Sequence, residues 1–215
     1  ILFGDYIYGK CLQLIETKED FELLSIYSKV ARELPQGELL QKDLSEAQNH
    51  DINSYFAVID RKTASMFGAA AYTGAKTACR NASYVEAAEQ FGRLLGRAFQ
   101  IKDDIFDYTP QAQVGKPTLN DLREGKFTLP IIHAMEQVGK TTSAHIVEMA
   151  KNNDLIDKNK DFLYDFVAQN DGIEYARQQM EVYRSKAMDC LVDFADSTEK
   201  KSLCDILDFV LQRTN

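Results

Sequence analysis

The stretch "GRAFQIKDDIFDY", from Gly96 to Tyr108, places three aspartates within five residues, among apolar and helix-forming residues. In a helix, Asp103 and Asp107 lie one turn apart and Asp104 lies beside Asp103, so the three carboxylates are expected to converge. Mutual repulsion and the negative end of the helix dipole both disfavour acids there. A divalent cation offsets both costs, and magnesium combines carboxylate oxygens with substrate phosphates and water.

The helix that carries these acids is predicted over about residues 84–108. Apolar residues recur along it at helical spacing and indicate a face toward the core: Leu94, Ala98, Ile101 and Ile105. Gly92 and Gly96 lack a Cβ, so we expect a neighbouring helix to approach closely at these two positions.

The rest of the chain has the same helical periodicity and no sustained alternation typical of strands, which predicts one all-α domain over 1–215. Helices are expected at about 1–15, 21–34, 53–78, 127–138, 142–152, 160–169, 172–195 and 199–212. Pro35 and Gly37 predict a kink or a break after the second of these. Asn53 or Ser54 is expected to cap the third, and residues 109–121 form the longest predicted loop.

Composition excludes several classes of function. A net charge of −8 disfavours nucleic acid as a partner. No apolar run approaches the roughly 18 residues that a membrane span requires. The four cysteines are scattered, which predicts reduced thiols in a cytoplasmic protein, and no histidine has a partner at zinc-ligand spacing.

Basic residues follow the acids at short range. "GKPTLNDLREGKFTLP", from Gly115 to Pro130, contains Lys116, Arg123 and Lys126. In the alternative interpretation these residues form no site: the acids end a surface helix, and the lysines are solvated on the surface. Acids that bind a metal next to lysines that bind phosphate predict instead a site for a metal–diphosphate group.

Several motifs occur in a familiar order: "ILFGDYIYGK" (1–10), "GELLQ" (37–41), "RKTA" (61–64), "FQIKDDIFDY" (99–108) and "GKPTLNDLREGKFTLPII" (115–132). Together they resemble the trans-isoprenyl (polyprenyl) diphosphate synthases over about residues 1–140. The resemblance implies an isoprenoid synthase fold, in which long helices surround a central cavity. It also implies a magnesium-dependent prenyltransferase that joins an allylic diphosphate to isopentenyl diphosphate, and a homodimer formed through helices early in the chain.

The resemblance also assigns roles to residues at the matching positions. Asp103, Asp104 and Asp107 match the second aspartate-rich motif of the family, whose acids bind magnesium on the allylic diphosphate. Lys62 and Lys116 match lysines that hold this diphosphate.

Four further positions follow from the same motifs. Lys126 matches a basic position near the diphosphate. Thr63 and Gln100 match polar residues close to the developing carbocation, and Phe99 matches an aromatic residue that approaches the isopentenyl group. No nucleophilic side chain is required, because the reaction ionises a carbon–oxygen bond and the protein stabilises the charges that result.

The sequence departs from the family pattern in two places. The first aspartate-rich motif and its paired arginines are expected before Ile1, so the domain is expected to be N-terminally incomplete. Two explanations agree with this: the chain is a fragment of a synthase that is inactive alone, or it is a natural non-catalytic partner subunit. A class I terpene cyclase is a further alternative, because it shares the metal chemistry.

The second departure is Leu119, which stands where the family often has glycine. The motif "GELLQ" is typical of synthases with medium or long products.

Overall fold

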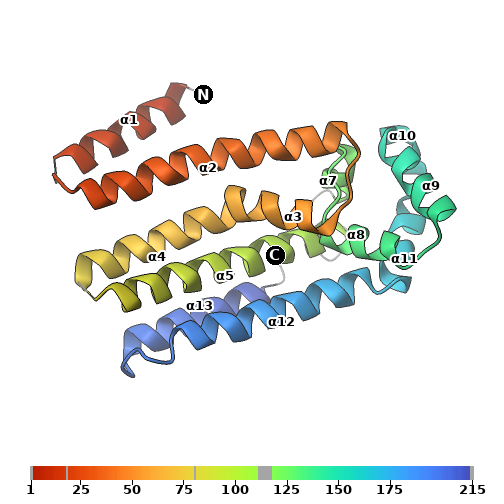
Figure 1. Cartoon of the computed structure of the whole chain (residues 1–215). Helices are drawn as coiled ribbons and strands as arrows, with labels where there is room; N and C mark the ends of the chain where they lie inside the picture. The colour runs from red at the N-terminus through yellow and green to blue at the C-terminus, as the bar shows by residue number, and fades with distance from the viewer. Residues whose placement is uncertain (1, 18, 80, 111–117, 214–215) are drawn as a thin grey trace.

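The computed structural model describes residues 2–17, 19–79, 81–110 and 118–213 and consists of helices joined by short connections (Figure 1). The first half comprises α1 (Leu2–Glu16), α2 (Phe21–Glu46), α3 (Ile52–Ile59), the π-helical turn η1 (Asp60–Ala64), α4 (Ser65–Ala78) and α5 (Ala82–Asp107). The second comprises α7 (Asn120–Arg123), α8 (Leu129–Glu136), α9 (Lys140–Ala150), α10 (Asn153–Lys158), α11 (Lys160–Gln169), α12 (Gly172–Cys190) and α13 (Thr198–Gln212). The described residues contain no strand, which confirms the all-α prediction.

The long helices lie side by side, and α5 packs between α4 and α12 (Figure 1). Ala98, Ile101 and Ile105 on the predicted apolar face of α5 are buried in the main hydrophobic core. Each buried isoleucine contributes about 1.5–3 kcal/mol of hydrophobic free energy. The shorter helices α8–α11 gather at the end of the bundle that the acids of α5 approach.

The close contact predicted at Gly92 and Gly96 is confirmed. A Cβ on Gly92 would lie 2.4 Å from the carbonyl oxygen of Phe67, and one on Gly96 would lie 2.8 Å from the Cα of Ala64. Both neighbours are backbone atoms that cannot move aside alone. The two glycines therefore set the distance between α5 and the segment that carries Lys62.

Of the two outcomes predicted at Pro35 and Gly37, the break is wrong, because α2 is one helix from Phe21 to Glu46, and the kink stays a prediction. The backbone hydrogen bond that Pro35 cannot donate is outweighed by the packing of α2 along η1 and α4. Gly37 serves this packing, since a Cβ there would lie 2.9 Å from the backbone nitrogen of Lys62.

Helix ends differ from the prediction where a side chain caps the backbone. Asp51, rather than Asn53 or Ser54, caps α3, because its Oδ2 accepts a hydrogen bond of 2.7 Å from the Ser54 N–H. Helices α7 and α10 were not predicted, since each has at most six residues and too few for a clear period. Residues 111–117 of the predicted loop lie outside the described residues.

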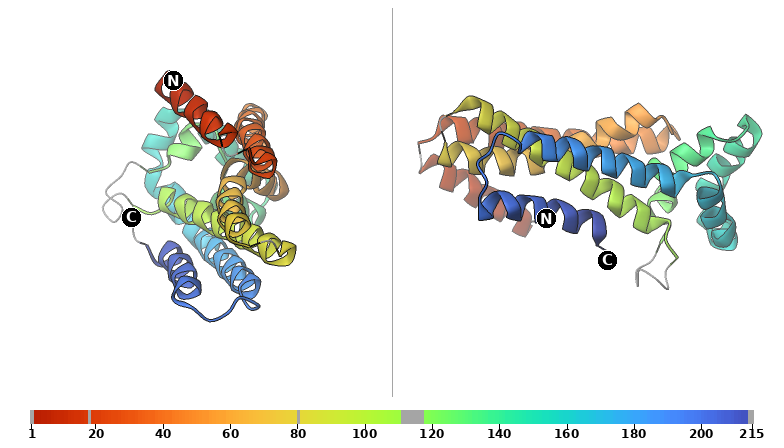
Figure 2. Two further views of the ribbon diagram at one scale, coloured as in Figure 1. Left: turned by 90° about the vertical axis from the view of Figure 1, so that its left-hand side faces the viewer. Right: turned by 90° about the horizontal axis from the view of Figure 1, so that it is seen from below.

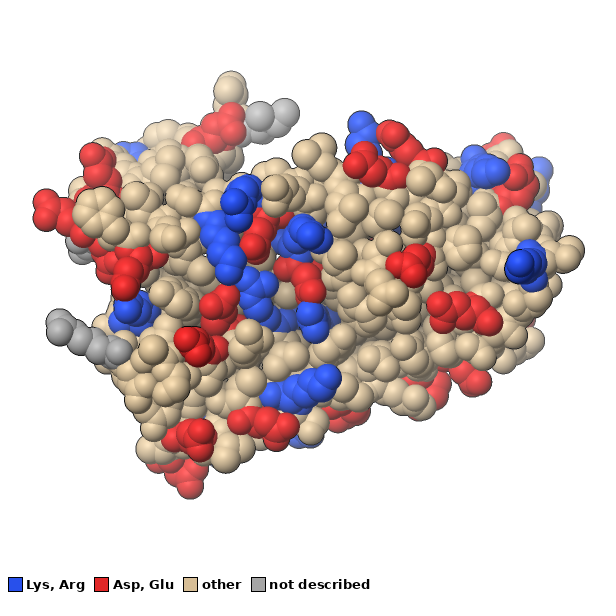
Figure 3. Space-filling model, viewed as in Figure 1, with Lys and Arg blue, Asp and Glu red and all other residues tan. Residues whose placement is uncertain are grey.

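Charged side chains of both signs are mixed on the face seen in Figure 3, where lysines and arginines gather near the middle with acids among them. Several cations in the molecule have acidic partners, such as Arg93 with Glu33 and Glu89. This mixture, with the net charge of −8, agrees with the expectation that nucleic acid is not a partner. Among the described residues, no helix is long and apolar enough to cross a bilayer.

Candidate functional site

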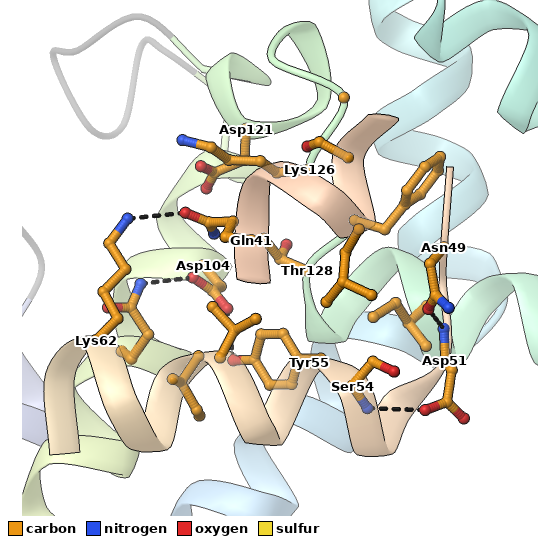
Figure 4. Close-up of a pocket in the computed structure, with 18 residues that line it drawn as sticks. Gln41, Asn49, Asp51, Ser54, Tyr55, Lys62, Asp104, Asp121, Lys126 and Thr128 are labelled. Carbon is orange, nitrogen blue, oxygen red and sulfur yellow. Dashed lines mark hydrogen bonds between the residues drawn. The ribbon is translucent and has the colours of Figure 1, made fainter. Parts of the chain in front are cut away.

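A cavity of about 70 Å³ lies beside the end of α5 and brings together residues from four parts of the chain (Figure 4). Its polar lining includes Gln41 of α2, Tyr55 of α3, Lys62 of η1, Gln100 and Asp104 of α5, and Asp121 and Lys126. Four of the predicted site residues, Lys62, Gln100, Asp104 and Lys126, therefore share one cavity.

Asp104 is the most buried of the three acids, with 1% of its surface exposed. Its Oδ2 accepts a hydrogen bond of 2.6 Å from the Tyr55 hydroxyl, and its Oδ1 accepts one of 3.0 Å from Gln100 Nε2. Burial, followed by the negative charge of Asp121, raises the pKa of Asp104 from 3.8 to about 8, although both hydrogen bonds oppose the shift.

Asp107 and Asp103 each have different partners. The two Asp107 oxygens accept hydrogen bonds of 2.9 and 3.1 Å from the backbone N–H groups of Asn120 and Asp121, at the start of α7. Burial raises the pKa of Asp107 to about 6, and these N–H groups oppose the increase. The Asp103 side chain is 41% exposed, and its Oδ1 lies 2.5 Å from Nη2 of Arg213.

The convergence of the three carboxylates is therefore not observed, because each is drawn to a different hydrogen-bond donor. Among the residues that the structure describes, no three His, Cys, Asp or Glu side chains form a group that could hold a metal ion. Magnesium nevertheless needs only one or two protein carboxylates when substrate phosphates and water supply the other ligands. The half-exposed carboxylate of Asp103, one turn from Asp107, fits this kind of site.

Thr63, Gln100, Asp104 and Tyr55 form one chain of hydrogen bonds. The Thr63 hydroxyl donates to Gln100 Oε1 at 2.8 Å, and Gln100 Nε2 donates onward to Asp104, which also accepts from Tyr55. Both ends of the Gln100 amide are thus held, which fixes its orientation. Thr63 belongs to the π-helical turn η1, a type of turn that is frequent at functional sites.

Two predicted lysines reach the same region. Lys62 Nζ donates to Gln41 Oε1 at 2.9 Å and lies 3.1 Å from the Glu38 carboxylate. Lys126 Nζ contacts Glu124, and the Lys126 backbone N–H bonds the Asp121 carbonyl at 2.8 Å. Both ammonium groups have acidic partners from outside the α5 acid cluster and can exchange these for a more highly charged anion.

Phe99 is not among the residues that line the cavity, and neither are Thr63, Asp103 and Asp107. The Phe99 ring packs on Phe67, with ring centroids 5.3 Å apart, and belongs to the second hydrophobic cluster, formed with α12 and α13. Lys116 lies outside the described residues. The roles predicted for Phe99 and Lys116 stay predictions.

The sequence reasoning missed Tyr55, Asp121 and Arg213. Asp121 lies within the quoted "GKPTLNDLREGKFTLP", where an acid between two lysines was a usable signal. Burial raises its pKa and the positive charge of Lys126 opposes the increase. Tyr55 and Arg213 are 49 and 110 residues from their aspartate partners, so no local pattern could have found them.

Leu119 precedes α7 and has left-handed backbone angles, with φ of 59° and ψ of 25°. Its side chain is fully buried. Glycine adopts this conformation most readily, so a leucine here holds the turn with some backbone strain, offset by the burial of its side chain.

Comparison with known proteins gives a consistent result. A polyprenyl synthetase family model matches residues 1–167. The chain is 31% identical over 211 residues to octaprenyl diphosphate synthase of Haemophilus influenzae, covering 96% of this chain and 63% of that protein. It is 30% identical over 220 residues to the Escherichia coli enzyme of the same name, covering 99% and 66%. The chain thus spans slightly less than two thirds of these relatives.

Solved structures share the fold. A geranylgeranyl pyrophosphate synthase from Bacteroides thetaiotaomicron superposes with a TM-score of 0.89 at 35% identity, covering 99% of this chain and 70% of that one. A polyprenyl synthase from Caulobacter crescentus, complexed with calcium and isoprenyl diphosphate, has a TM-score of 0.89 at 26% identity, covering 100% and 66%. The isoprenoid synthase architecture is therefore common to this chain and these structures.

Proposed function

Because the chain belongs to the polyprenyl synthetase family, we propose that the protein is a trans-prenyltransferase that joins an allylic diphosphate to isopentenyl diphosphate. One observation carries the proposal: Asp104 of the acidic end of α5 and two lysines from separate segments, Lys62 and Lys126, line one cavity. In this reaction the allylic carbon–oxygen bond breaks, its electron pair leaves with the diphosphate, and the isopentenyl double bond attacks the cation. Loss of a proton then gives the longer polyprenyl diphosphate.

We assign metal binding to the acids of α5, with magnesium as the cation. Bound magnesium would neutralise charge on the leaving diphosphate. Asp103, whose side chain is 41% exposed, is one ligand, and Asp107 would supply a second once it releases the backbone N–H groups of α7. Asp104 completes the predicted trio, but it is only 1% exposed and its oxygens accept hydrogen bonds from Tyr55 and Gln100, so it acts mainly by holding Gln100 in place.

Lys62 and Lys126 hold the diphosphate from the opposite side, and Lys116 is assigned the same role from its motif alone. To do so, Lys62 leaves Gln41 and Glu38, and Lys126 leaves Glu124. A diphosphate carries more charge than either carboxylate, which favours the exchange.

Thr63 and Gln100 present weak dipoles to the carbocation rather than nucleophiles. Their mutual hydrogen bond and the bond to Asp104 hold both dipoles in fixed orientations, so the cation is stabilised without being trapped. Phe99 is assigned to the isopentenyl group on the same basis in the sequence. "GELLQ" favours a medium or long product, and the names of the relatives range from geranylgeranyl to octaprenyl.

The exposed apolar surface of α1 supports a homodimer. Leu2, Phe3 and Leu14 are 84, 76 and 63% exposed, and α1 buries no residue. Several large apolar side chains exposed on one helix suit a surface that packs against a second copy of the chain. Sedimentation velocity tests the dimer: Phe3→Ser should shift the protein toward the monomer, and an unchanged dimer would contradict this assignment.

We also propose a cytoplasmic location, which agrees with the four unbridged cysteines.

Prenyl transfer is tested by incorporation of labelled isopentenyl diphosphate in the presence of an allylic diphosphate and magnesium. Asp103→Ala should reduce incorporation at least about a hundredfold, since a positioned charge contributes on the order of 3 kcal/mol to the transition state. Asp189→Ala is the matched control, because Asp189 is an exposed aspartate in the last turn of α12. Equal activity of the two variants would contradict the proposed role of Asp103.

A further inference from the structure

The end of α13 returns to the acidic end of α5. Helix α13 runs alongside α12 and also contacts α5 (Figure 2). Arg213 follows the last residue of α13 and donates from Nη2 to Asp103 Oδ1 at 2.5 Å and to the Phe99 carbonyl at 3.2 Å. A residue 110 positions along the chain thus contacts the first acid of the cluster.

Arg213 lies in a formed socket rather than on an open surface. Its guanidinium is 4.2 Å from the centroid of the Phe99 ring and 5.4 Å from that of Phe106. Only 14% of its side chain is exposed. Its Nε is buried and has no hydrogen-bond partner among the described residues. The aromatic faces stabilise the Arg213 guanidinium. The buried Nε without an acceptor costs free energy, so it offsets part of the stabilisation that holds Arg213 in this place.

The Asp103 side chain that Arg213 contacts is 41% exposed, so a cation can reach it from solvent. A guanidinium and a divalent cation are both attracted to the Asp103 carboxylate, and their positive charges repel each other. We propose that Arg213 is an internal competitor of the metal: it holds Asp103 in the metal-free protein, and divalent cation binding displaces it and frees the end of α13. The inference rests on the proposed function, because it requires that Asp103 binds the metal.

The effect of the hydrogen bond between Arg213 and Asp103 can be separated from the general effect of a positive charge near the acids. Removing any nearby cation raises divalent metal affinity slightly. Lys102 provides the control, since it precedes Asp103 on α5 and its Nζ lies 5.2 Å from the Phe106 ring centroid. Arg213→Gln and Lys102→Gln remove the same charge from the same neighbourhood. Only the first removes the hydrogen bond of 2.5 Å to Asp103.

The experiment measures Mn²⁺ binding from the electron paramagnetic resonance spectrum, with inorganic pyrophosphate present to supply the remaining ligands and a protein-free sample as the reference for the Mn²⁺–pyrophosphate complex. The exchange measurements below contain pyrophosphate as well. Arg213→Gln should bind Mn²⁺ about tenfold more tightly than the unaltered protein, which corresponds to about 1.4 kcal/mol. Lys102→Gln should change the affinity less than about threefold. Equal affinities of the Arg213→Gln variant and the unaltered protein, or equal gains in the two variants, would overturn the proposal.

Asp103→Asn distinguishes this proposal from the proposed function. The variant should lose Mn²⁺ binding whichever residue occupies position 213. If it binds Mn²⁺ normally, Asp103 is not a ligand and the metal assignment itself fails, as it does if no form of the protein binds Mn²⁺. Loss of binding in Asp103→Asn with no gain in Arg213→Gln overturns only the competition.

Hydrogen exchange provides a second readout that a purely structural role would not move. Magnesium should increase amide exchange in the last turn of α13, around Phe209 to Gln212, in the unaltered protein. In Arg213→Gln this turn should exchange quickly with or without magnesium. The Arg213 backbone N–H donates to the Phe209 carbonyl at 2.9 Å, and this hydrogen bond remains in the variant. Faster exchange in Arg213→Gln would therefore come from the lost side-chain contact and not from a lost backbone hydrogen bond. Slow exchange that magnesium does not alter in either protein would contradict the displacement.

Discussion

Replacing Asp104 by asparagine should remove much of the dependence of folding stability on pH between 5 and 8. Asp104 is 1% exposed, and its pKa is raised from 3.8 to about 8 in the folded protein. The folded state therefore binds the Asp104 proton more tightly than the unfolded chain does. Asparagine has nearly the same shape and stays neutral, so its free energy of unfolding does not include this proton.

The sign of the effect is opposite to that of a carboxylate in an ion pair. Because the folded pKa of Asp104 is the higher one, its contribution to stability is fully present below pH 4. It decreases as pH rises and is lost at about pH 8. At 1.36 kcal/mol for each pKa unit, the loss between pH 5 and 8 is on the order of 4 kcal/mol.

Urea denaturation at pH 5 and pH 8, with a chelator present, measures this difference. The free energy of unfolding of the Asp104→Asn variant should fall less between the two pH values than that of the unaltered protein, by a few kcal/mol. A constant cost of about 1 kcal/mol from altered hydrogen bonds with Tyr55 and Gln100 cancels in this comparison. Asp189→Asn, at an exposed position, should behave as the unaltered protein does. Parallel pH profiles for the Asp104→Asn variant and the unaltered protein would refute the reasoning.

Three further substitutions test the backbone and the ion pairs near the site, each by urea denaturation. Leu119→Gly should be about 1 kcal/mol more stable than Leu119→Ala, because only glycine relieves the left-handed backbone. Gly37→Ala should cost about 1–3 kcal/mol and weaken pyrophosphate binding, because its Cβ would lie 2.9 Å from the backbone nitrogen of Lys62. Arg97→Lys should cost on the order of 1 kcal/mol, because it breaks the paired hydrogen bonds of 2.5 and 2.6 Å to Asp60, which are about one third exposed.

Each of these has an outcome that would count against it. If Leu119→Ala proved the more stable of its pair, the backbone at position 119 would not be strained. Unchanged pyrophosphate binding by Gly37→Ala would show that the spacing of α2 and η1 does not position Lys62. Full stability of Arg97→Lys would show that the forked geometry of the pair with Asp60 contributes nothing.

The helices could be predicted from the sequence where the apolar period is long and uninterrupted. Helix α5 was expected over 84–108 and is observed over Ala82–Asp107. Three residues of its predicted apolar face are buried and the fourth, Leu94, is partly buried. The break offered as one outcome at Pro35 does not occur, because packing against η1 outweighs the local preference of proline, and no local pattern reports that packing.

The candidate site was predicted in its parts but not in its arrangement. Four predicted residues do line one cavity: Lys62, Gln100, Asp104 and Lys126. They could be predicted because the motifs indicate which residue types the chemistry needs. The directions of the carboxylates depend on distant donors such as Arg213, and on the backbone N–H groups of α7. These partners follow from the tertiary fold, so spacing along α5 could not reveal that the three acids diverge.

Binding of inorganic pyrophosphate, measured by calorimetry with and without magnesium, tests the central claim most directly. If the acids of α5 hold a cation that bridges to a diphosphate, tight binding should require magnesium and should be lost in Asp103→Asn but kept in Asp189→Asn. Pyrophosphate binding that is equally strong with a chelator present, or that Asp103→Asn leaves unchanged, would contradict the account.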